Sequence, residues 1–345
     1  MAAVTRSPFV SHAQNGEDVV LWRALQGVES GRYVDVGANH PVHDSVTKAF
    51  YDRGWSGLSV EPVAAFAAAL REARPRDVVA EVAVTDTDGG EVVLHAFADT
   101  GLSTLRDEYV RDAVGAGHAL TEVRVPTRRL DSLVAEHLAD AEVHFCKVDV
   151  EGAEAQVLAS VDLTAWRPWV LVVEATRPNS TEGTHAEWEP GVLAAGYRSC
   201  LFDGLSRFYV AEEHADLAPA LSYPACVLDG AVTAELLAAR SELAHLQHVH
   251  HETVQELERL RGQLGRVGEL EREVATLRSE LVRWRGQVLE RWAAATGGDS
   301  PGAGGAGGEE ATRLHAEIAA MRRTLSWRVT RPLRSVRALQ KRTGV

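Results

Sequence analysis

Two apolar runs in the middle of the chain each carry carboxylates near their ends. The run HFCKVDV (144–150) contains Asp149 and is followed by Glu151, and the run WVLVVEA (169–175) contains Glu174. If both runs are strands, alternation places Asp149 and Glu151 on one face. A hydroxyl nucleophile needs such a base at neutral pH. We predict Asp149 as the base or substrate anchor, with Glu151 and Glu174 as the next candidates.

The same three carboxylates have a second interpretation. Together they could hold one divalent cation such as Mg²⁺, which would lower the pKa of a hydroxyl. We do not favour this alternative, and the sequence leaves the metal ligands undefined. Lys147 is interpreted as an ion-pair partner of a neighbouring carboxylate.

A turn with one glycine follows an earlier apolar run, RYVDV (32–36). The stretch YVDVGANHPVHDS (33–45) turns at Gly37, which permits close approach of a ligand. Dinucleotide-binding loops need three glycines because a pyrophosphate must reach a helix N-terminus. Asn39 and Val42 occupy the second and third of those positions. We therefore do not expect an NAD enzyme.

Two later positions indicate another ligand. Glu61 ends the second predicted strand, where a carboxylate can accept hydrogen bonds from both hydroxyls of a ribose. Ala83 and Val84 end the third predicted strand and can flank an adenine. The single-glycine turn, the acid and the apolar pair occur in this order, which indicates S-adenosylmethionine, a cofactor without phosphates.

These residues need a sheet that brings them together. Short β-rich runs alternate with helix-like runs up to about residue 230, which is typical of an α/β fold with a doubly wound, mainly parallel sheet. We predict helices over 64–73 and 154–160. The predicted strands are 32–36, 58–62, 78–84, 92–97, 144–150 and 169–175.

A different pattern begins near residue 231. Apolar or tolerated residues recur at alternating steps of three and four, as in a heptad seam, and a stammer lies at Leu270. The seam comprises Leu243, Leu246, His250, Thr253, Leu257, Leu260, Leu264, Val267, Leu270, Val274, Leu277, Leu281, Trp284 and Val288. We predict a coiled coil over 231–295 and a homo-oligomer formed through it. A single amphipathic helix docked on its own domain is the alternative.

The end of the chain is basic. Residues 296–308 form a glycine-rich linker by composition, and residues 309–345 are predicted to be a basic amphipathic helix and tail. Eight Lys or Arg residues and no acid lie within 321–345, whereas the whole chain has a net charge of -13. We expect no nucleic-acid partner, and we expect the tail to contact an anionic membrane surface or a partner protein.

The composition is that of a soluble globular protein. No run of about 18 apolar residues is present, and the N-terminus lacks the apolar core of a signal peptide. Cys146, Cys200 and Cys226 are scattered and form no disulfide framework. We expect a cytoplasmic protein that is at most peripheral to the inner face of the membrane.

Several long motifs occur in the order of one known family. The sequence resembles the FkbM family of S-adenosylmethionine-dependent methyltransferases over residues 11–214. The motifs are AQNGEDVVL, YVDVGANHP, DSVTKAFYDRGWSGLSVEP, TGLST, HFCKVDVEGAE, RPWVLVVEAT and FDGLSRFYVA. The resemblance implies a Rossmann-like class I methyltransferase domain over 1–230 and O-methylation, with a sugar hydroxyl of a glycan or glycosylated metabolite as acceptor. The branch it resembles most is associated with surface-polysaccharide and glycosyltransferase genes, which makes a glycosyltransferase a partner of the tail.

The resemblance also implies roles for individual residues. Asp35, Gly37 and Asn39 would line the methionine end of the cofactor, and the N-terminal segment would close over it. The full predicted cofactor set is Gln14, Glu17, Asp35, Gly37, Ala38, Asn39, Glu61, Ala83, Val84 and Asp149. His40 and Pro41 stand where many relatives have Asp-Gly. Pro41 is expected to stiffen the start of a following helix, and His40 faces either the methyl-transfer site or solvent.

A scaffold is the rival interpretation: a methyltransferase-like domain that organises glycan-assembly enzymes through its coiled coil and tail. Asp35, Glu61 and Asp149 favour an enzyme, because a scaffold has no need of them. Trp55 and Tyr197 are predicted to be core residues, and Trp188 either a core residue or part of an acceptor pocket.

Overall fold

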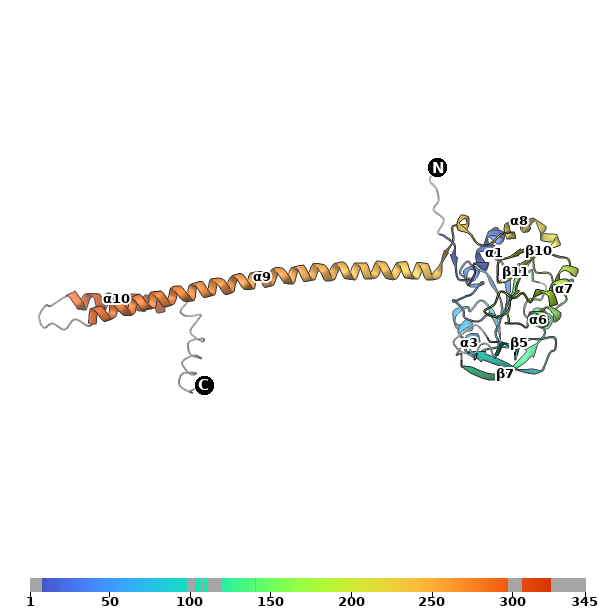
Figure 1. The fold of residues 1–345 in the computed structure, drawn as a ribbon, viewed down its shortest axis with the longest axis horizontal. Helices are drawn as coiled ribbons and strands as arrows, with labels where there is room; N and C mark the ends of the chain where they lie inside the picture. Colours follow the sequence, from blue (N-terminus) through green and yellow to red (C-terminus); the bar gives the residue numbers. More distant parts are fainter. Residues whose placement is uncertain are drawn as a thin grey trace, which may run out of the picture. The chain divides into compact units, whose positions relative to one another are not determined.

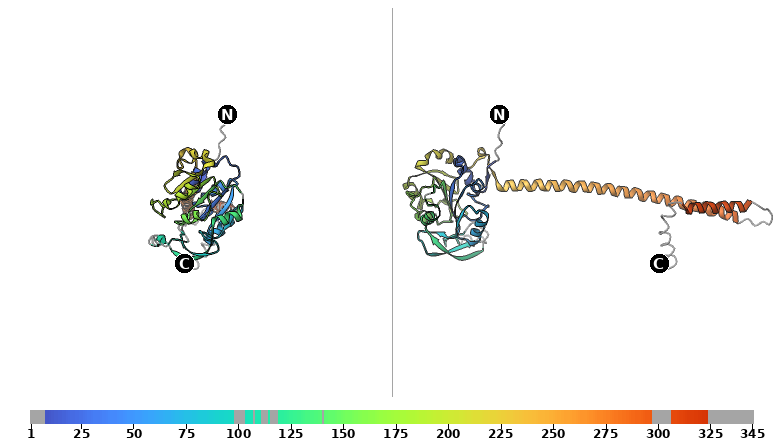
Figure 2. Two further views of the ribbon diagram at one scale, coloured as in Figure 1. Left: turned by 90° about the vertical axis from the view of Figure 1, so that its right-hand side faces the viewer. Right: turned by 180° about the vertical axis from the view of Figure 1, so that it is seen from behind.

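The computed structural model describes residues 8–97, 103–106, 108–110, 114, 119–139, 141–296 and 306–323. The chain forms two compact units, residues 1–244 and residues 245–345. Figures 1 and 2 show the strands of the first unit and the helices α9 and α10. The tail after residue 323 and most of the predicted linker lie outside the described residues, and their predicted properties stay predictions.

A seven-stranded sheet forms the centre of the first unit. In spatial order its strands are β10 (Tyr197–Phe202), β11 (Ser206–Ala211), β9 (Val170–Glu174), β8 (Phe145–Val148), β2 (Arg32–Val36), β3 (Ser56–Val60) and β4 (Val78–Ala80). The pairs β2–β3, β2–β8, β3–β4 and β8–β9 are parallel. Of these seven strands, β11 runs antiparallel to both neighbours. The prediction of a mainly parallel sheet is confirmed.

Helices cover both faces of this sheet, whose central strands are apolar on both sides. One core contains Val34 and Val148 with side chains from α5 (Leu130–His137), α6 (Glu154–Ala159) and α7 (Glu189–Ala194). The other contains Tyr33 and Phe145 with side chains from α1 (Glu17–Leu25), α2 (Lys48–Tyr51) and α8 (Ala218–Leu221). Short 3₁₀ helices span His185–Glu187, Glu212–Leu217 and Val227–Asp229.

Local sequence patterns predicted several of these elements well. The helix predicted over 64–73 is α3 (Ala64–Ala73), and the one predicted over 154–160 is α6. Trp55 and Tyr197 are buried core residues, as predicted. Trp188 is also buried in a core, where its ring meets that of Tyr209 edge-on. Core packing is therefore the interpretation of Trp188 that the structure supports.

A second, three-stranded sheet corrects one predicted strand. Its order is β5 (Ala83–Val84), β7 (Leu120–Arg128) and β6 (Glu91–Phe97). The run predicted as one strand over 78–84 is two strands, because β4 pairs with β3 whereas β5 pairs with β7. The apolar pattern continues across the junction, and no local signal marks the change of pairing partner. The strand β7 itself has no counterpart among the predicted strands.

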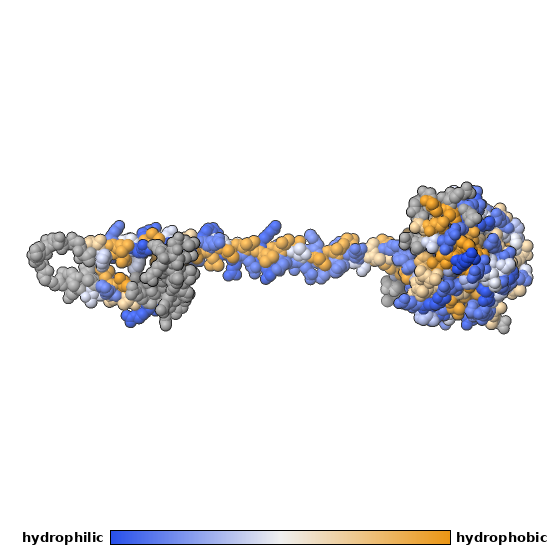
Figure 3. Space-filling model, turned by 90° about the horizontal axis from the view of Figure 1, so that it is seen from below, coloured by the Kyte–Doolittle hydropathy of each residue, from blue (hydrophilic) through white to orange (hydrophobic). Residues whose placement is uncertain are grey.

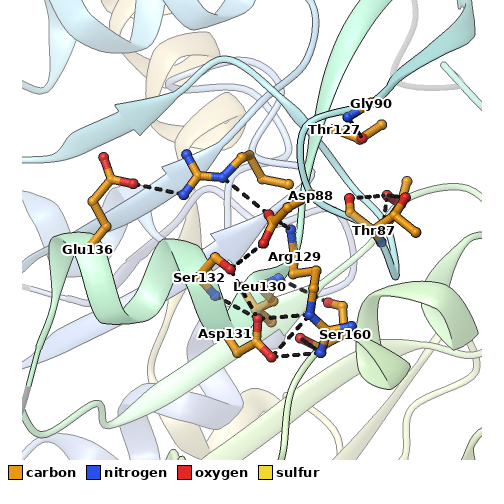
Figure 4. A network of polar contacts seen from close by, with 12 residues as sticks. Thr87, Asp88, Gly90, Thr127, Arg129, Leu130, Asp131, Ser132, Glu136 and Ser160 are labelled. Carbon is orange, nitrogen blue, oxygen red and sulfur yellow. Dashed lines mark hydrogen bonds and ion pairs between the residues drawn. The ribbon is translucent and has the colours of Figure 1, made fainter.

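A polar network joins this second sheet to α5 (Figure 4). Asp88 accepts hydrogen bonds from the backbone N–H of Arg129 at 2.7 Å and from Oγ of Ser132 at 2.5 Å. The guanidinium of Arg129 pairs with Asp131 and donates to the carbonyl oxygen of Ser160. These contacts hold the end of β7 at the start of α5, and β5 is placed through its pairing with β7.

The last elements follow the sheet. The strand β1 (Val10–Ser11) pairs in parallel with β12 (Val232–Thr233), beyond the domain boundary expected near residue 230. The helices α9 (Ala234–Thr296) and α10 (Ala306–Arg322) come next. Leucines of the predicted seam are exposed in the single chain, for example Leu264 at 70%, and Figure 3 shows hydrophobic residues along α9. Among the described residues, none of the helices combines the length and the hydrophobicity that a membrane span requires.

Candidate active site

The carboxyl ends of the parallel strands surround a pocket, at the edge where α/β sheets bind ligands. The predicted site residues that line it are Gln14, Gly37, Asn39, Glu61, Ala83, Val84, Asp149 and Glu151. Three other predicted cofactor residues, Glu17, Asp35 and Ala38, are buried and are not among the described residues that line the pocket. The structure thus brings residues from five separate segments to one place.

Gly37 is required by a contact that the sequence did not reveal. Its φ is +82°, and a Cβ at this position would lie 1.8 Å from the carbonyl oxygen of Asp149. The N–H of Gly37 donates to the carbonyl oxygen of Val60 at 3.0 Å. The next turn residue, Asn39, also has a left-handed φ of +49°. The turn therefore passes directly over the loop that carries Asp149, and only glycine fits there.

Glu61 is held in place by two backbone groups. Its carboxylate accepts hydrogen bonds from the N–H of Asn39 and the N–H of Val63, each at 2.8 Å. Burial raises the pKa of Glu61 to about 7. Each carboxylate oxygen keeps a free lone pair, so a pair of neighbouring hydroxyls in the pocket would find two acceptors. The side-chain Oδ1 of Asn39 is also buried and has no hydrogen-bond partner among the described residues.

An apolar wall completes the pocket, and the sequence analysis found only part of it. Ala83 and Val84 belong to this wall, together with Phe66 of α3 and Leu94 of β6. Phe66 is the one aromatic residue in the helix AAFAAALREA, which is a signal that could have identified it. Apolar and aromatic side chains of this kind suit a flat heteroaromatic ring.

Asp35 lies behind the pocket rather than in its lining. Oγ1 of Thr47 donates to its Oδ2 at 2.7 Å, and Nη1 of the fully buried Arg74 donates to the same Oγ1 at 2.7 Å. Nζ of Lys147 lies 3.7 Å from Oδ1 of Asp35 and 3.2 Å from Oδ2 of Asp149. The ion-pair role predicted for Lys147 is confirmed. The supporting pair of Thr47 and Arg74 was missed, because it joins distant segments.

The N-terminal segment is fixed by two buried acids at the start of α1. Asp18 accepts hydrogen bonds from Oγ of Ser11 at 2.6 Å and from the N–H of His12 at 2.8 Å. Glu17 accepts one from the N–H of Asn15 at 3.0 Å. Burial raises the pKa of Glu17 to about 7 and that of Asp18 to about 6. These bonds shape the turn that places Gln14 at the pocket.

The three predicted catalytic carboxylates converge. One oxygen each of Asp149, Glu151 and Glu174 lies within 4.8 Å of the other two. The reasoning from strand alternation was wrong for Glu151, because β8 ends at Val148 and Glu151 has a left-handed φ of +51°. Burial, followed by repulsion from Asp149, raises the pKa of Glu151 to about 9 and that of Glu174 well above its ordinary range.

The loop that carries Glu151 is held from several sides. Oε1 of Glu154 accepts hydrogen bonds from the N–H groups of Val150 at 3.2 Å and Gly152 at 3.0 Å. Oγ1 of Thr104 donates to the carbonyl oxygen of Glu151 at 2.7 Å. Burial raises the pKa of Glu154. The loop therefore has a defined shape, and Glu151 is directed by the backbone.

His40 has a local structural role. Its Nδ1 accepts hydrogen bonds from the N–H of Val42 at 3.1 Å and the N–H of His43 at 3.0 Å, so the neutral ring carries its proton on Nε2. The carbonyl oxygen of Pro41 accepts a hydrogen bond from Arg74. The next helix, α2, begins only at Lys48. The expectation that Pro41 stiffens a helix start is therefore wrong: both residues shape the turn.

Comparison with known proteins agrees with this geometry. Residues 35–199 match the family model of the methyltransferase FkbM domain. The matched region contains the turn after β2, the apolar wall and all three converging carboxylates. No curated protein matches the chain significantly. The chain therefore carries an FkbM methyltransferase domain, as the resemblance of its motifs implied.

Proposed function

We propose that this protein is an S-adenosylmethionine-dependent O-methyltransferase whose acceptor is a sugar hydroxyl of a glycan or glycosylated metabolite. The observation that carries the proposal is the pocket itself. A backbone-anchored acid, an apolar wall and two carboxylates, Asp149 and Glu151, meet in it, with Glu174 close to both, inside a methyltransferase domain. The sugar acceptor rests on the resemblance to the surface-polysaccharide branch.

The pocket fits the parts of this cofactor. Glu61 would accept hydrogen bonds from the ribose hydroxyls, and the wall with Phe66 and Val84 would hold the adenine. The unpaired Oδ1 of Asn39 is suited to the ammonium group of the methionine part. S-adenosylmethionine supplies a methyl group on a sulfonium, so the protein needs to orient the acceptor and exclude water.

The carboxylate cluster would act on the acceptor. Methyl transfer to a hydroxyl oxygen releases one proton, which a nearby carboxylate can accept. Asp149 lines the pocket beside the turn of Gly37 and is held by Lys147. Asp149 is therefore the base or anchor in this proposal, and Glu151 and Glu174 act with it.

Calorimetry with S-adenosylmethionine tests the cofactor, and a labelled-methyl assay with glycan extracts followed by mass spectrometry tests the acceptor. The Asp149→Ala variant should lose turnover by at least about a hundredfold and still bind the cofactor. Asp216→Ala, at an exposed position, is the control and should keep both. Absence of cofactor binding to folded wild-type protein would refute the proposal.

A scaffold role is the second candidate, favoured by the exposed leucines of α9. In that case the chain would join glycan-assembly enzymes through α9 and the basic tail, at the cytoplasmic face of a membrane. The same calorimetry separates the two, because a scaffold needs no cofactor. Self-association through α9 is compatible with either function.

A further inference from the structure

We propose that Asp149, Glu151 and Glu174 bind one divalent cation that prefers oxygen ligands, such as Mn²⁺ or Mg²⁺. Their nearest oxygens lie within 4.8 Å of one another. Oxygens on opposite sides of a Ca²⁺ ion are up to about 5 Å apart, and around Mg²⁺ about 4.2 Å. Because 4.8 Å is the upper limit of the three separations, the three oxygens are close enough together to contact one such cation.

Two buried oxygens in the cluster lack a donor. Oε2 of Glu174 and Oε2 of Glu151 have no hydrogen-bond partner among the described residues, and Glu174 is only 7% exposed. A buried carboxylate oxygen without a donor or a cation is strongly unfavourable. A cation between the three side chains would satisfy both oxygens at once.

Lys147 does not neutralise the negative charge of the three carboxylates. Nζ of Lys147 approaches Asp149 and Asp35, and within the described chain no Lys, Arg or His forms an ion pair with Glu151 or Glu174. With all three carboxylates ionised, at least two negative charges remain. A divalent cation would neutralise them, which is a stronger reason for metal than the sequence alone offered.

A shared proton is the rival occupant, because Asp149 and Glu174 are close enough to hydrogen-bond when one of them is protonated. The two occupants differ in what they would do. A cation beside the pocket would polarise an acceptor hydroxyl and ease its deprotonation. That catalytic role rests on the proposed function, whereas the binding of the cation does not.

The test is titration of Mn²⁺ into full-length, chelator-treated protein, followed by the electron paramagnetic resonance signal of free Mn²⁺. We expect one Mn²⁺ per chain that Mg²⁺ displaces, and this displacement distinguishes the carboxylates from histidines on α9, which bind Mg²⁺ poorly. Glu174→Gln and Glu151→Gln should each weaken binding at least about tenfold, since even outer-shell changes cost that much. Glu72→Gln, an exposed change on α3, should have no effect.

The results of this titration distinguish a bound cation from a shared proton. Failure of folded wild-type protein to bind Mn²⁺ below millimolar concentration, or equal binding by the two cluster variants, would overturn the site in favour of the shared proton. If Glu174→Gln does not fold, as circular dichroism would show, Glu151→Gln decides. Cofactor calorimetry on the same protein reports on the proposed function independently of the metal.

A separate observation concerns α9. We infer that its seam pairs with a second copy of this chain as a parallel, in-register coiled coil. Among the acidic residues that directly precede seam positions are Glu256, Glu273 and Glu280, and five positions after each of these three stands a basic residue that directly follows a seam position: Arg261, Arg278 and Arg285. In a parallel, in-register pair, a residue that directly precedes a seam position lies beside the residue five positions later in the partner helix. Each of these glutamates of one helix would therefore lie beside an arginine of the other.

An antiparallel pair would bring like positions together, glutamate with glutamate and arginine with arginine. The opposite charges occur on both sides of the stammer at Leu270, so the phase slip does not remove them. The exposed leucines Leu257, Leu277 and Leu281 supply apolar surface for the pairing. The charged pairs thus favour a second copy of this helix in the parallel orientation, and the seam supplies the apolar surface that the pairing buries.

The test is oxidative cross-linking of Leu277→Cys, at the seam, against Ser279→Cys, two residues further round the helix. Both are made with Cys226→Ser, which removes the exposed native thiol. We expect a disulfide-linked dimer from Leu277→Cys and at least about tenfold less from Ser279→Cys, because only seam positions of a parallel pair are adjacent. Monomeric wild-type protein in light scattering, or equal cross-linking of both variants, would overturn the inference.

Discussion

Replacing Gly37 by alanine tests whether the turn after β2 is fixed by its contact with the loop after β8. The new Cβ would lie 1.8 Å from the carbonyl oxygen of Asp149 and 2.9 Å from its carbonyl carbon. Both are backbone atoms, so a side-chain rotation cannot relieve the clash. The φ of +82° is unfavourable for alanine as well.

Gly54 offers a matched control for this change. Its φ is +91°, and no described atom lies within 4 Å of a Cβ built there. Gly54→Ala should therefore cost only the backbone term, about 1–2 kcal/mol. Gly37→Ala should cost that plus about 1–3 kcal/mol for the forced shift. The difference between the two variants isolates the contact between the turn and the loop.

Urea unfolding of both variants measures this difference, and calorimetry with S-adenosylmethionine measures its effect on the pocket. We expect Gly37→Ala to be destabilised more than Gly54→Ala by at least about 1 kcal/mol and to lose cofactor affinity. Gly54→Ala should keep the affinity of the wild type. Equal destabilisation of the two variants would show that the contact with Asp149 does not constrain the turn.

Two further predictions concern buried charges near the pocket. Burial raises the pKa of Glu17 from 4.5 to about 7, so the folded state holds its proton longer than the unfolded state, and this contribution to stability is lost as pH rises from about 4.5 to about 7. Glu17→Gln should remove up to about 3 kcal/mol of that pH dependence. Urea unfolding of the wild type and the variant at several pH values from 5 to 8 measures it. The same dependence of the unfolding free energy on pH in both proteins would contradict the prediction. Arg74 is fully buried and donates to Thr47, Ser45 and Pro41, so Arg74→Met should cost about 3–5 kcal/mol. Arg71→Met, which removes an exposed ion pair on α3, should cost at most about 1 kcal/mol, and similar losses for both would contradict the role of Arg74.

Local patterns in the sequence were sufficient to predict the helices and strands whose apolar residues follow a regular spacing. The helix α3 begins and ends where its pattern predicts, and the apolar runs that became β8 and β9 are central strands. Glu61, Ala83 and Asp149, which line the pocket, were predicted because ligands bind at strand ends, and strand ends can be read from the chain. The heptad pattern of α9 is likewise a property of spacing alone.

Other features depend on which segments become neighbours. The run over 78–84 divides because β5 finds β7 as its partner, some 40 residues later. Thr47 and Arg74 stand behind Asp35 although they are 27 residues apart. Phe66 enters the pocket from the helix side. Each of these contacts joins distant parts of the chain, and no periodic pattern records such a pairing.

Residue types and their spacing were enough to predict a mainly parallel α/β domain with a single-glycine turn, acids at strand ends and a long helix with a heptad pattern. These follow from residue type and spacing, which act locally. The packing of distant segments, in contrast, places Gly37 over Asp149 and brings Glu151, with its left-handed φ, together with Asp149 and Glu174. A close approach between two loops depends on where whole strands lie, and the crossover connections of the sheet set those positions.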